Sequence, residues 1–255
     1  MRAMPESASL NEIHFKMSGS DGIDLLHRIS TADLHALKPG QSTSALILTP
    51  QGKILTAFRV LKVNDAELVI SVAHSVKDQL SSVLLETIDQ YTFGEKFTLQ
   101  KIENSPSSLP SLSDLERIRH AIPAVDHEFR PDGTTNPLEV NFQIAIADQK
   151  GCYPGQEVVE KMISVGSSPK KLAIVRAETA TAAQELASRL PLALFDAGQP
   201  AAQLTSITED GQRSIGLAIV RKTHFKKGLI FFSEDGQRFT IADESFTLDS
   251  KSENE

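Results

Sequence analysis

Residues 150–157 read Lys-Gly-Cys-Tyr-Pro-Gly-Gln-Glu, a composition unlike that of an ordinary loop. Gly151 and Gly155 flank the Cys-Tyr-Pro core, and glycine at these positions permits close backbone approach and an exposed turn. Lys150 stands two residues before Cys152, where an ammonium group favours the thiolate and increases its reactivity. The alternative is a Gly-Pro turn around a buried, inert cysteine, since free cysteine is among the most buried residue types. The pattern by itself leaves both interpretations open.

The composition of the whole chain argues against several classes of protein. The chain has 255 residues, 40% of them hydrophobic, a net charge of -7, and 5% aromatic residues with no Trp. An acidic chain with few aromatics is not expected to bind duplex DNA or to stack bases. Cys152 is the single cysteine, which excludes an intramolecular disulfide and indicates a reducing compartment. We find no signal-peptide pattern and no membrane-spanning run, so the expected location is cytoplasmic.

The N-terminal half alternates strand and helix patterns. Apolar and polar residues alternate from Leu10 to Met17, as in a strand. Helical spacing of apolar residues follows, ending near Ser30, and recurs between Val76 and Ile88. Further strands are predicted at residues 44–49, 54–63, 67–72 and 96–102. This order, β-α-β-β-β-α-β, predicts a split βαβ-type region.

The C-terminal half is rich in short strands. A Ser/Pro-rich linker is predicted at 104–113, a short helix at 114–120 and a longer one at 182–190. Strands are predicted at residues 171–177, 202–208, 214–221, 228–233 and 238–241. Their short spacing predicts a small antiparallel β-barrel. The predicted domains are 1–166, formed by two interwoven subdomains, and the barrel at 167–248, followed by a disordered tail at 249–255.

Several chemical motifs are absent from the sequence. There is no P-loop, no G-x-G-x-x-G and no G-x-S-x-G. His120, Asp126, His127 and Glu128 lie close in sequence, but no matching distal ligand accompanies them, so we expect a solvated surface and no metal. Thiol catalysis by Cys152 would require a histidine base that spacing cannot identify.

The segment resembles the hallmark K-G-C-[FY]-x-G-Q-E of the YgfZ/GcvT folate-binding family, in its YgfZ branch. Three flanking stretches are also similar to the family. Arg117, Ile118 and Ile122-Pro123 match its R-I-E-x-G-I-P run, and residues 136–141 match its P-x-E-x-N step. Downstream, Gly166 with Lys170-Lys171-Leu172 resembles its R-G-x-x-x-R-x-L. The N-terminal half agrees more loosely: residues 49–55, Thr-Pro-Gln-Gly-Lys-Ile-Leu, are similar to its PQGRIL hairpin.

The resemblance implies an α+β, aminomethyltransferase-like folate-binding fold. It implies a bacterial accessory protein that binds tetrahydrofolate, in the 5-formyl or 5,10-methylene form, and supports the assembly or repair of iron-sulfur enzymes, including tRNA-modifying ones. The partners expected are folate and iron-sulfur client or assembly proteins. Two alternatives stay open: a tetrahydrofolate-dependent aminomethyltransferase or demethylase, and a protein-binding module that has lost folate. We favour a non-enzymatic role; as an enzyme, the chain would be a one-carbon transferase.

The resemblance also implies a set of site residues. Lys150 and Cys152 are the candidate reactive pair. At position 119 the family has a Glu that accepts from the pterin ring, whereas Arg119 offers only donors, so the pterin acceptor is expected at Glu139. The predicted folate-binding residues are Asp33, Glu139, Asn141, Lys150, Tyr153, Gln156, Glu157 and Lys161.

Overall fold

The computed structural model of the chain describes residues 12–73, 79–103, 112–148, 150–166, 168–178, 183–211, 213–242 and 245. The chain divides into two compact units. The first unit comprises residues 1–111, 130–137 and 142–165, and the second comprises residues 112–129, 138–141 and 166–255. Residues 112–129 and 138–141 thus group with residues 166–255, apart from the rest of the N-terminal half.

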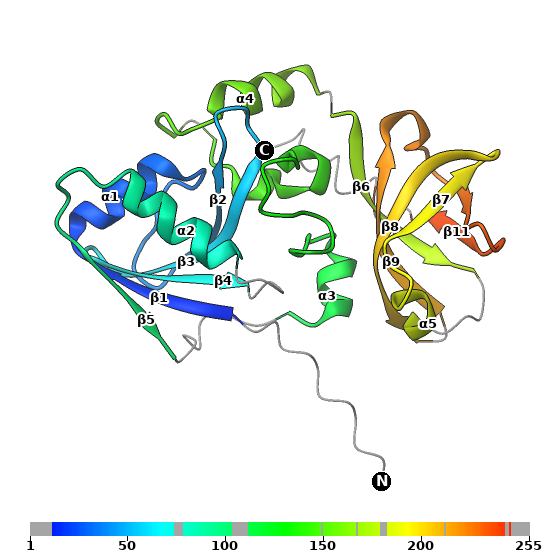
Figure 1. Cartoon of the computed structure of the whole chain (residues 1–255), viewed down its shortest axis with the longest axis horizontal. Coiled ribbons are helices and arrows are strands. Elements are labelled where there is room, and N and C mark those ends of the chain that lie inside the picture. Colours follow the sequence, from blue (N-terminus) through cyan, green and yellow to red (C-terminus); the bar gives the residue numbers. More distant parts are fainter. Residues whose placement is uncertain are drawn as a thin grey trace, which may run out of the picture. The chain divides into compact units, whose positions relative to one another are not determined.

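A five-stranded antiparallel sheet forms the first unit (Figure 1). Its elements are β1 (Glu12–Ser18), α1 (Ser20–Ile29), β2 (Ser42–Leu48), β3 (Ile54–Asn64), β4 (Glu67–Ala73), α2 (Gln79–Gln90) and β5 (Thr98–Ile102). The strand order β2-β3-β4-β1-β5 places two strands between β1 and β2. The predicted β-α-β-β-β-α-β order is therefore confirmed. Leu10, Asn11, residues 76–78 and the tail lie outside the described residues.

The two helices pack on the sheet through one apolar stripe each. In α1, Ile23, Leu26 and Ile29 are buried and recur at helical spacing. This helix contacts β1 and β4, while α2 contacts β3 and β4. Burial of each such side chain contributes about 1.5–3 kcal/mol relative to leaving it exposed. The stripe thus fixes the C-terminal end of α1, which becomes important for the site.

Three short helices are described between residues 137 and 165. They are η1 (Pro137–Val140), η2 (Phe142–Ala145) and α4 (Gln156–Val165). In the first unit η2 contacts β2, and the Thr31 hydroxyl donates to the carbonyl of Ala145 at 2.6 Å. The same hydroxyl accepts from the Leu46 amide at 2.9 Å. Thr31 therefore ties η2 to β2 through both of its hydrogen-bonding functions.

The second unit is a closed β-barrel with α3 (Asp114–Arg119). Its elements are β6 (Lys170–Ala177), α5 (Ala183–Ala187), β7 (Leu192–Asp196), β8 (Gln199–Asp210), β9 (Arg213–Arg221), η3 (Lys222–His224), β10 (Ile230–Phe232) and β11 (Arg238–Ile241). The closed order is β10-β11-β6-β9-β8-β7. The predicted barrel is confirmed, with β7 as a strand that the pattern did not indicate.

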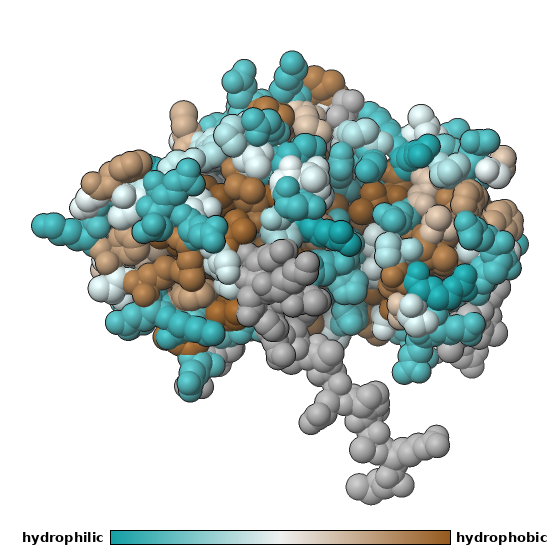
Figure 2. Space-filling model, viewed as in Figure 1, coloured by the Kyte–Doolittle hydropathy of each residue, from teal (hydrophilic) through white to brown (hydrophobic). Residues whose placement is uncertain are grey.

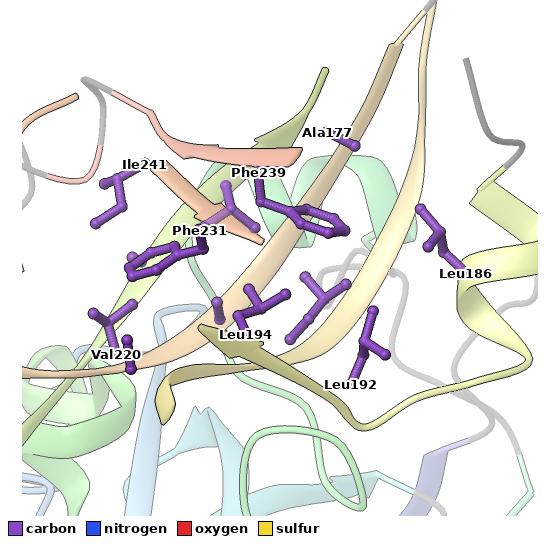
Figure 3. Close-up of a cluster of buried hydrophobic side chains, with 13 residues drawn as sticks. Ala177, Leu186, Leu192, Leu194, Val220, Phe231, Phe239 and Ile241 are labelled. Atoms are coloured by element: carbon purple, nitrogen blue, oxygen red, sulfur yellow. The ribbon is translucent and has the colours of Figure 1, made fainter. Parts of the chain in front are cut away.

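Buried apolar side chains fill the barrel. Phe231 and Phe239 face into it with Leu194 and Ile241, among thirteen clustered residues (Figure 3). Both phenylalanines are fully buried. Gly216 lies opposite the register shift in β8, where a Cβ would stand 2.4 Å from the Ser206 carbonyl oxygen. Only glycine permits this approach of the two strands.

A buried polar network joins α3 to the barrel. Arg117 donates to the Glu128 carboxylate at 3.1 Å and to the Ser206 hydroxyl at 2.9 Å. The hydroxyls of Thr205 and Ser206 donate to the other Glu128 oxygen at 2.7 and 2.6 Å. Both charged groups are almost fully buried and hydrogen-bonded, which is the condition under which a buried ion pair is tolerated. Glu128 is therefore part of the packing of the second unit, not the solvated surface predicted.

No described helix combines the length and the apolar character needed to cross a bilayer. The face drawn in Figure 2 interleaves hydrophilic and hydrophobic residues.

Candidate functional site

The segment 150–157 is held by two buried anchors with an exposed stretch between them. Lys150 and Tyr153 are 6% and 8% exposed, whereas Gly151 and Cys152 are exposed. The Lys150 ammonium lies 5.4 Å from the centre of the Tyr153 ring, a cation-π distance. Burial raises the pKa of Tyr153 to about 12, and Glu160 adds to the rise, so the phenol stays protonated. Cys152 is exposed, so the alternative of a buried cysteine is wrong.

Lys150 fastens the segment to the C-terminal end of α1. Its Nζ donates to the backbone carbonyls of His27, Ser30 and Ala32, at 2.5 Å for Ser30 and 3.0 Å for Ala32. The His27 carbonyl belongs to the last turn of the helix, whose carbonyls have no partner within the helix. The amide that would continue the helix, that of Thr31, donates instead to Leu46. The ammonium therefore satisfies acceptors that the end of α1 leaves open, where the helix dipole also favours a cation.

All three N-H groups of the ammonium are used in these bonds. Burial lowers the pKa of Lys150 to about 8, and the Asp33 carboxylate opposes that effect. The group is thus charged at neutral pH and has no donor left for a ligand or for the thiol. The geometry gives Lys150 a positioning role; direct action on a ligand or on Cys152 stays a prediction.

The segment 150–157 packs against the hairpin at residues 49–53, where Gly155 of the segment meets Gly52 of the hairpin. Gly155 has φ +82°, and a Cβ there would stand 2.4 Å from the Thr49 carbonyl oxygen and 2.9 Å from the Gly52 Cα. The Asn136 amide donates to the Gly52 carbonyl at 3.3 Å and to the Met162 sulfur at 3.0 Å. Three stretches that carry the resemblance, distant in sequence, are therefore packed together within the first unit.

The predicted ligand residues on α4 differ in their surroundings: one is hydrogen-bonded within the helix and two are exposed. The Gln156 amide donates to the Glu160 carboxylate at 2.6 Å, one turn along the helix. Glu157 and Lys161 are exposed, whereas Val159 is fully buried. The helix thus packs through Val159 and presents its charged residues to solvent.

Asp33 lies near Lys150 in a turn that contains His35, and His27 in the last turn of α1 lies close to that turn. Its Oδ1 accepts from the amides of His35 and Ala36, both at 3.1 Å, as in an Asx turn. The rings of His27 and His35 contact each other in a tilted arrangement, with centroids 4.1 Å apart and planes at 44°. Burial, the Lys150 ammonium and His35 lower the pKa of His27, while Asp33 opposes them. Sequence reasoning missed these histidines, because neither belongs to a recognisable motif.

Glu139, Asn141 and Arg119 belong to the second unit. Asn141 adopts φ +63°, and its amide donates to the carbonyl of Ala121 at 3.2 Å. Ala121 itself adopts φ +48°, at the position where the resembled family has Gly. Arg119 pairs with Asp210 at 2.5 Å, and Glu139 is half-buried. The left-handed backbone at Ala121 costs an alanine roughly 1–2 kcal/mol relative to glycine.

Each unit also has a surface cleft. The cleft of the first unit has a volume of about 490 Å³ and is lined by Asp21, Asp24, Arg28, His35 and Glu95. That of the second has a volume of about 350 Å³ and is lined by Arg119, Ile174, Arg176, Asp210 and Ile215. No predicted ligand residue lines either cleft. Among the residues that the structure describes, no group of three His, Cys, Asp or Glu side chains is arranged to hold a metal ion.

The sheet unit and the closed barrel are the two parts of an aminomethyltransferase-like fold. The chain is similar to the solved structure of glycine cleavage system aminomethyltransferase T from Bartonella henselae. The TM-score is 0.74, with 13% sequence identity, and the match covers 93% of this chain and 84% of the other. No family model and no curated protein sequence matches the chain. The likeness establishes the fold.

Proposed function

We propose that this chain binds a tetrahydrofolate and acts as an accessory protein in the assembly or repair of iron-sulfur enzymes, including those that modify tRNA. The observation that carries the proposal is the exposed thiol of Cys152, mounted on an aminomethyltransferase-like fold. The proposal rests further on the resemblance of residues 150–157 to the YgfZ branch of the folate-binding family.

The exposed position of Cys152, between two buried residues, supports a chemical role for the thiol. Buried residues flank Cys152 in sequence: Lys150 is hydrogen-bonded to the end of α1, and the Tyr153 side chain is buried. A Cβ added at Gly151 would meet nothing within 4 Å, so a client protein or a cluster ligand has room to approach. A thiolate is a soft ligand suited to iron and is also the nucleophile of disulfide exchange.

The residues present fit a reduced folate in their chemistry. A pterin ring offers an N-H edge that requires carboxylate acceptors, and the half-buried carboxylate of Glu139 is our candidate. The glutamate tail requires cations, and the exposed ammonium of Lys161 is available for it. Asp33, Asn141, Tyr153, Gln156 and Glu157 complete the proposed binding set.

The test is complementation in a strain that lacks this protein. We expect Cys152→Ala to fail to restore the activity of iron-sulfur enzymes and tRNA modification, although the protein accumulates to the wild-type level. Ser164→Ala, an exposed change on α4, is the matched control and should complement fully. Full complementation by Cys152→Ala would remove the thiol from the proposed function.

The fold match favours one second candidate, a folate-dependent aminomethyltransferase or demethylase. That reaction requires a base beside the folate amine. Asp33 is the candidate, because its Oδ1 is fixed by two backbone amides, so that the carboxylate is held in one orientation. Turnover of an aminomethyl donor by the wild type, abolished in Asp33→Asn, would establish the enzyme. Absence of turnover by protein that binds tetrahydrofolate would leave the accessory role.

A further inference from the structure

Six cationic side chains gather at one end of the barrel. The register of β6 and β9 places Lys170 opposite Arg221. The amide of Lys222 donates to the Pro169 carbonyl at 2.9 Å, and its ammonium to the Gly166 carbonyl at 3.1 Å. The basic end of the barrel is defined here as Lys170, Lys171, Arg221, Lys222, Lys226 and Lys227.

The charge of this end is opposite to that of the chain. Residues 166–171 and 219–229 contain these six cations and no Asp or Glu, whereas the chain has a net charge of -7. An acidic side chain from β7 lies near this end: the Asp196 carboxylate is 3.8 Å from the ring of His224, which stands between Lys222 and Lys226 in sequence. Such a concentration of one sign attracts an oppositely charged partner and increases its association rate.

The composition of the basic end indicates the kind of anion. Five of the six cations are lysines, which are hydrated point charges that do not impose the planar geometry of arginine. The Lys171 ammonium lies 5.0 Å from the centre of the Phe225 ring, so that this aromatic face already carries a cation and is not a platform for a base. The lysine point charges accept a flexible anion such as a carboxylate chain without a fixed geometry, and the occupied Phe225 ring argues against the stacked bases of single-stranded nucleic acid.

The extent of the surface indicates the size of the partner. The six cations come from two short segments at the ends of adjacent strands, and the chain as a whole has a net charge of -7. A short anionic segment can pair with these six cations alone, whereas a long polyanion such as duplex RNA would extend beyond them and would be repelled by the net negative charge of the chain. We propose that the basic end of the barrel binds a short Asp/Glu-rich segment of a partner protein, independently of the thiol and of folate.

The test uses the full chain and a fluorescent deca-glutamate peptide, with binding measured by anisotropy. We expect saturable binding at low salt that weakens about tenfold or more when salt is raised into the physiological range, because exposed charges are screened. Lys170→Glu with Lys226→Glu should weaken binding at least about tenfold, whereas Lys38→Glu with Lys101→Glu, an equal charge change at exposed sites of the first unit, should change it less than about twofold.

Three outcomes would overturn the proposal. The first is no binding of the peptide at low salt by folded protein. The second is an equal loss in both double variants, which would indicate net charge instead of this surface. The third is tighter binding of an RNA duplex of the same total charge, lost in Lys170→Glu with Lys226→Glu, which would assign the surface to nucleic acid.

Discussion

Replacing Lys150 by Met tests how much the end of α1 depends on one ammonium group. Methionine keeps much of the volume of the lysine stem but leaves two buried carbonyls and one part-buried carbonyl without their donor. An unsatisfied buried acceptor costs about 1–3 kcal/mol. The cost is partly offset because the variant no longer buries a charge, a burden evident in the lowered pKa of Lys150. We expect the free energy of unfolding to fall by roughly 3 kcal/mol, near the cost of breaking a buried charged network.

The measurement is urea unfolding followed by far-UV circular dichroism, with Lys38→Met as the exposed control. The control should lie within about 0.5 kcal/mol of the wild type. The m-value should be unchanged, so that the shift reports stability. The rate at which a maleimide alkylates Cys152 under native conditions should also differ from the wild-type rate in Lys150→Met, and it should equal the wild-type rate in the control. A loss below about 0.5 kcal/mol would refute the reasoning, since the carbonyls would then not depend on the ammonium.

Further predictions concern titration and packing. The pKa of Lys150 is depressed in the folded state, so wild-type stability relative to Lys150→Met should rise as pH increases from 8 to 10, measured by urea midpoints; a flat difference would contradict this. The pKa of His27, by NMR titration, should be higher in Lys150→Met because a neighbouring cation is removed, and an unchanged value would contradict the contact. Gly155→Ala should cost roughly 3 kcal/mol in urea unfolding, from a left-handed φ and a backbone clash, whereas Gly151→Ala, with open space around its Cβ, should be nearly neutral; equal effects would exclude the docked turn. Arg117→Met should destabilise by about 3–5 kcal/mol because it leaves a buried carboxylate unpaired, and a loss under about 1 kcal/mol would mean that water replaces the guanidinium.

Periodicity predicted most of the fold because most elements bury one regular face. It failed for α4, which begins inside the Gly-rich segment at Gln156 and carries Val158-Val159, a pair that lowers the helical signal. It also failed for β7, whose sequence Leu-Ala-Leu-Phe-Asp follows a helix and does not alternate. Both elements depend on tertiary contacts that no local pattern records.

The part of the site that could be predicted from the sequence is the turn at Gly155, because glycine marks positions of close backbone approach. The close backbone approach expected at Gly155 is present, but the one expected at Gly151 is not. The partners of Lys150 are backbone carbonyls, which carry no residue signature, so its anchoring to α1 could not be predicted. The same holds for Arg119, whose partner Asp210 lies on a barrel strand far along the chain.

Calorimetric titration with 5-formyltetrahydrofolate tests the central claim most directly. We predict saturable binding that weakens roughly tenfold or more in Glu139→Ala, because a hydrogen bond to a charged acceptor contributes about 1.5–3 kcal/mol. The exposed control Glu209→Ala should bind as the wild type does. Absence of binding up to millimolar ligand, by protein with the circular dichroism of the folded state, would contradict a folate site. The chain would then have an aminomethyltransferase-like fold without the ligand that we propose for it.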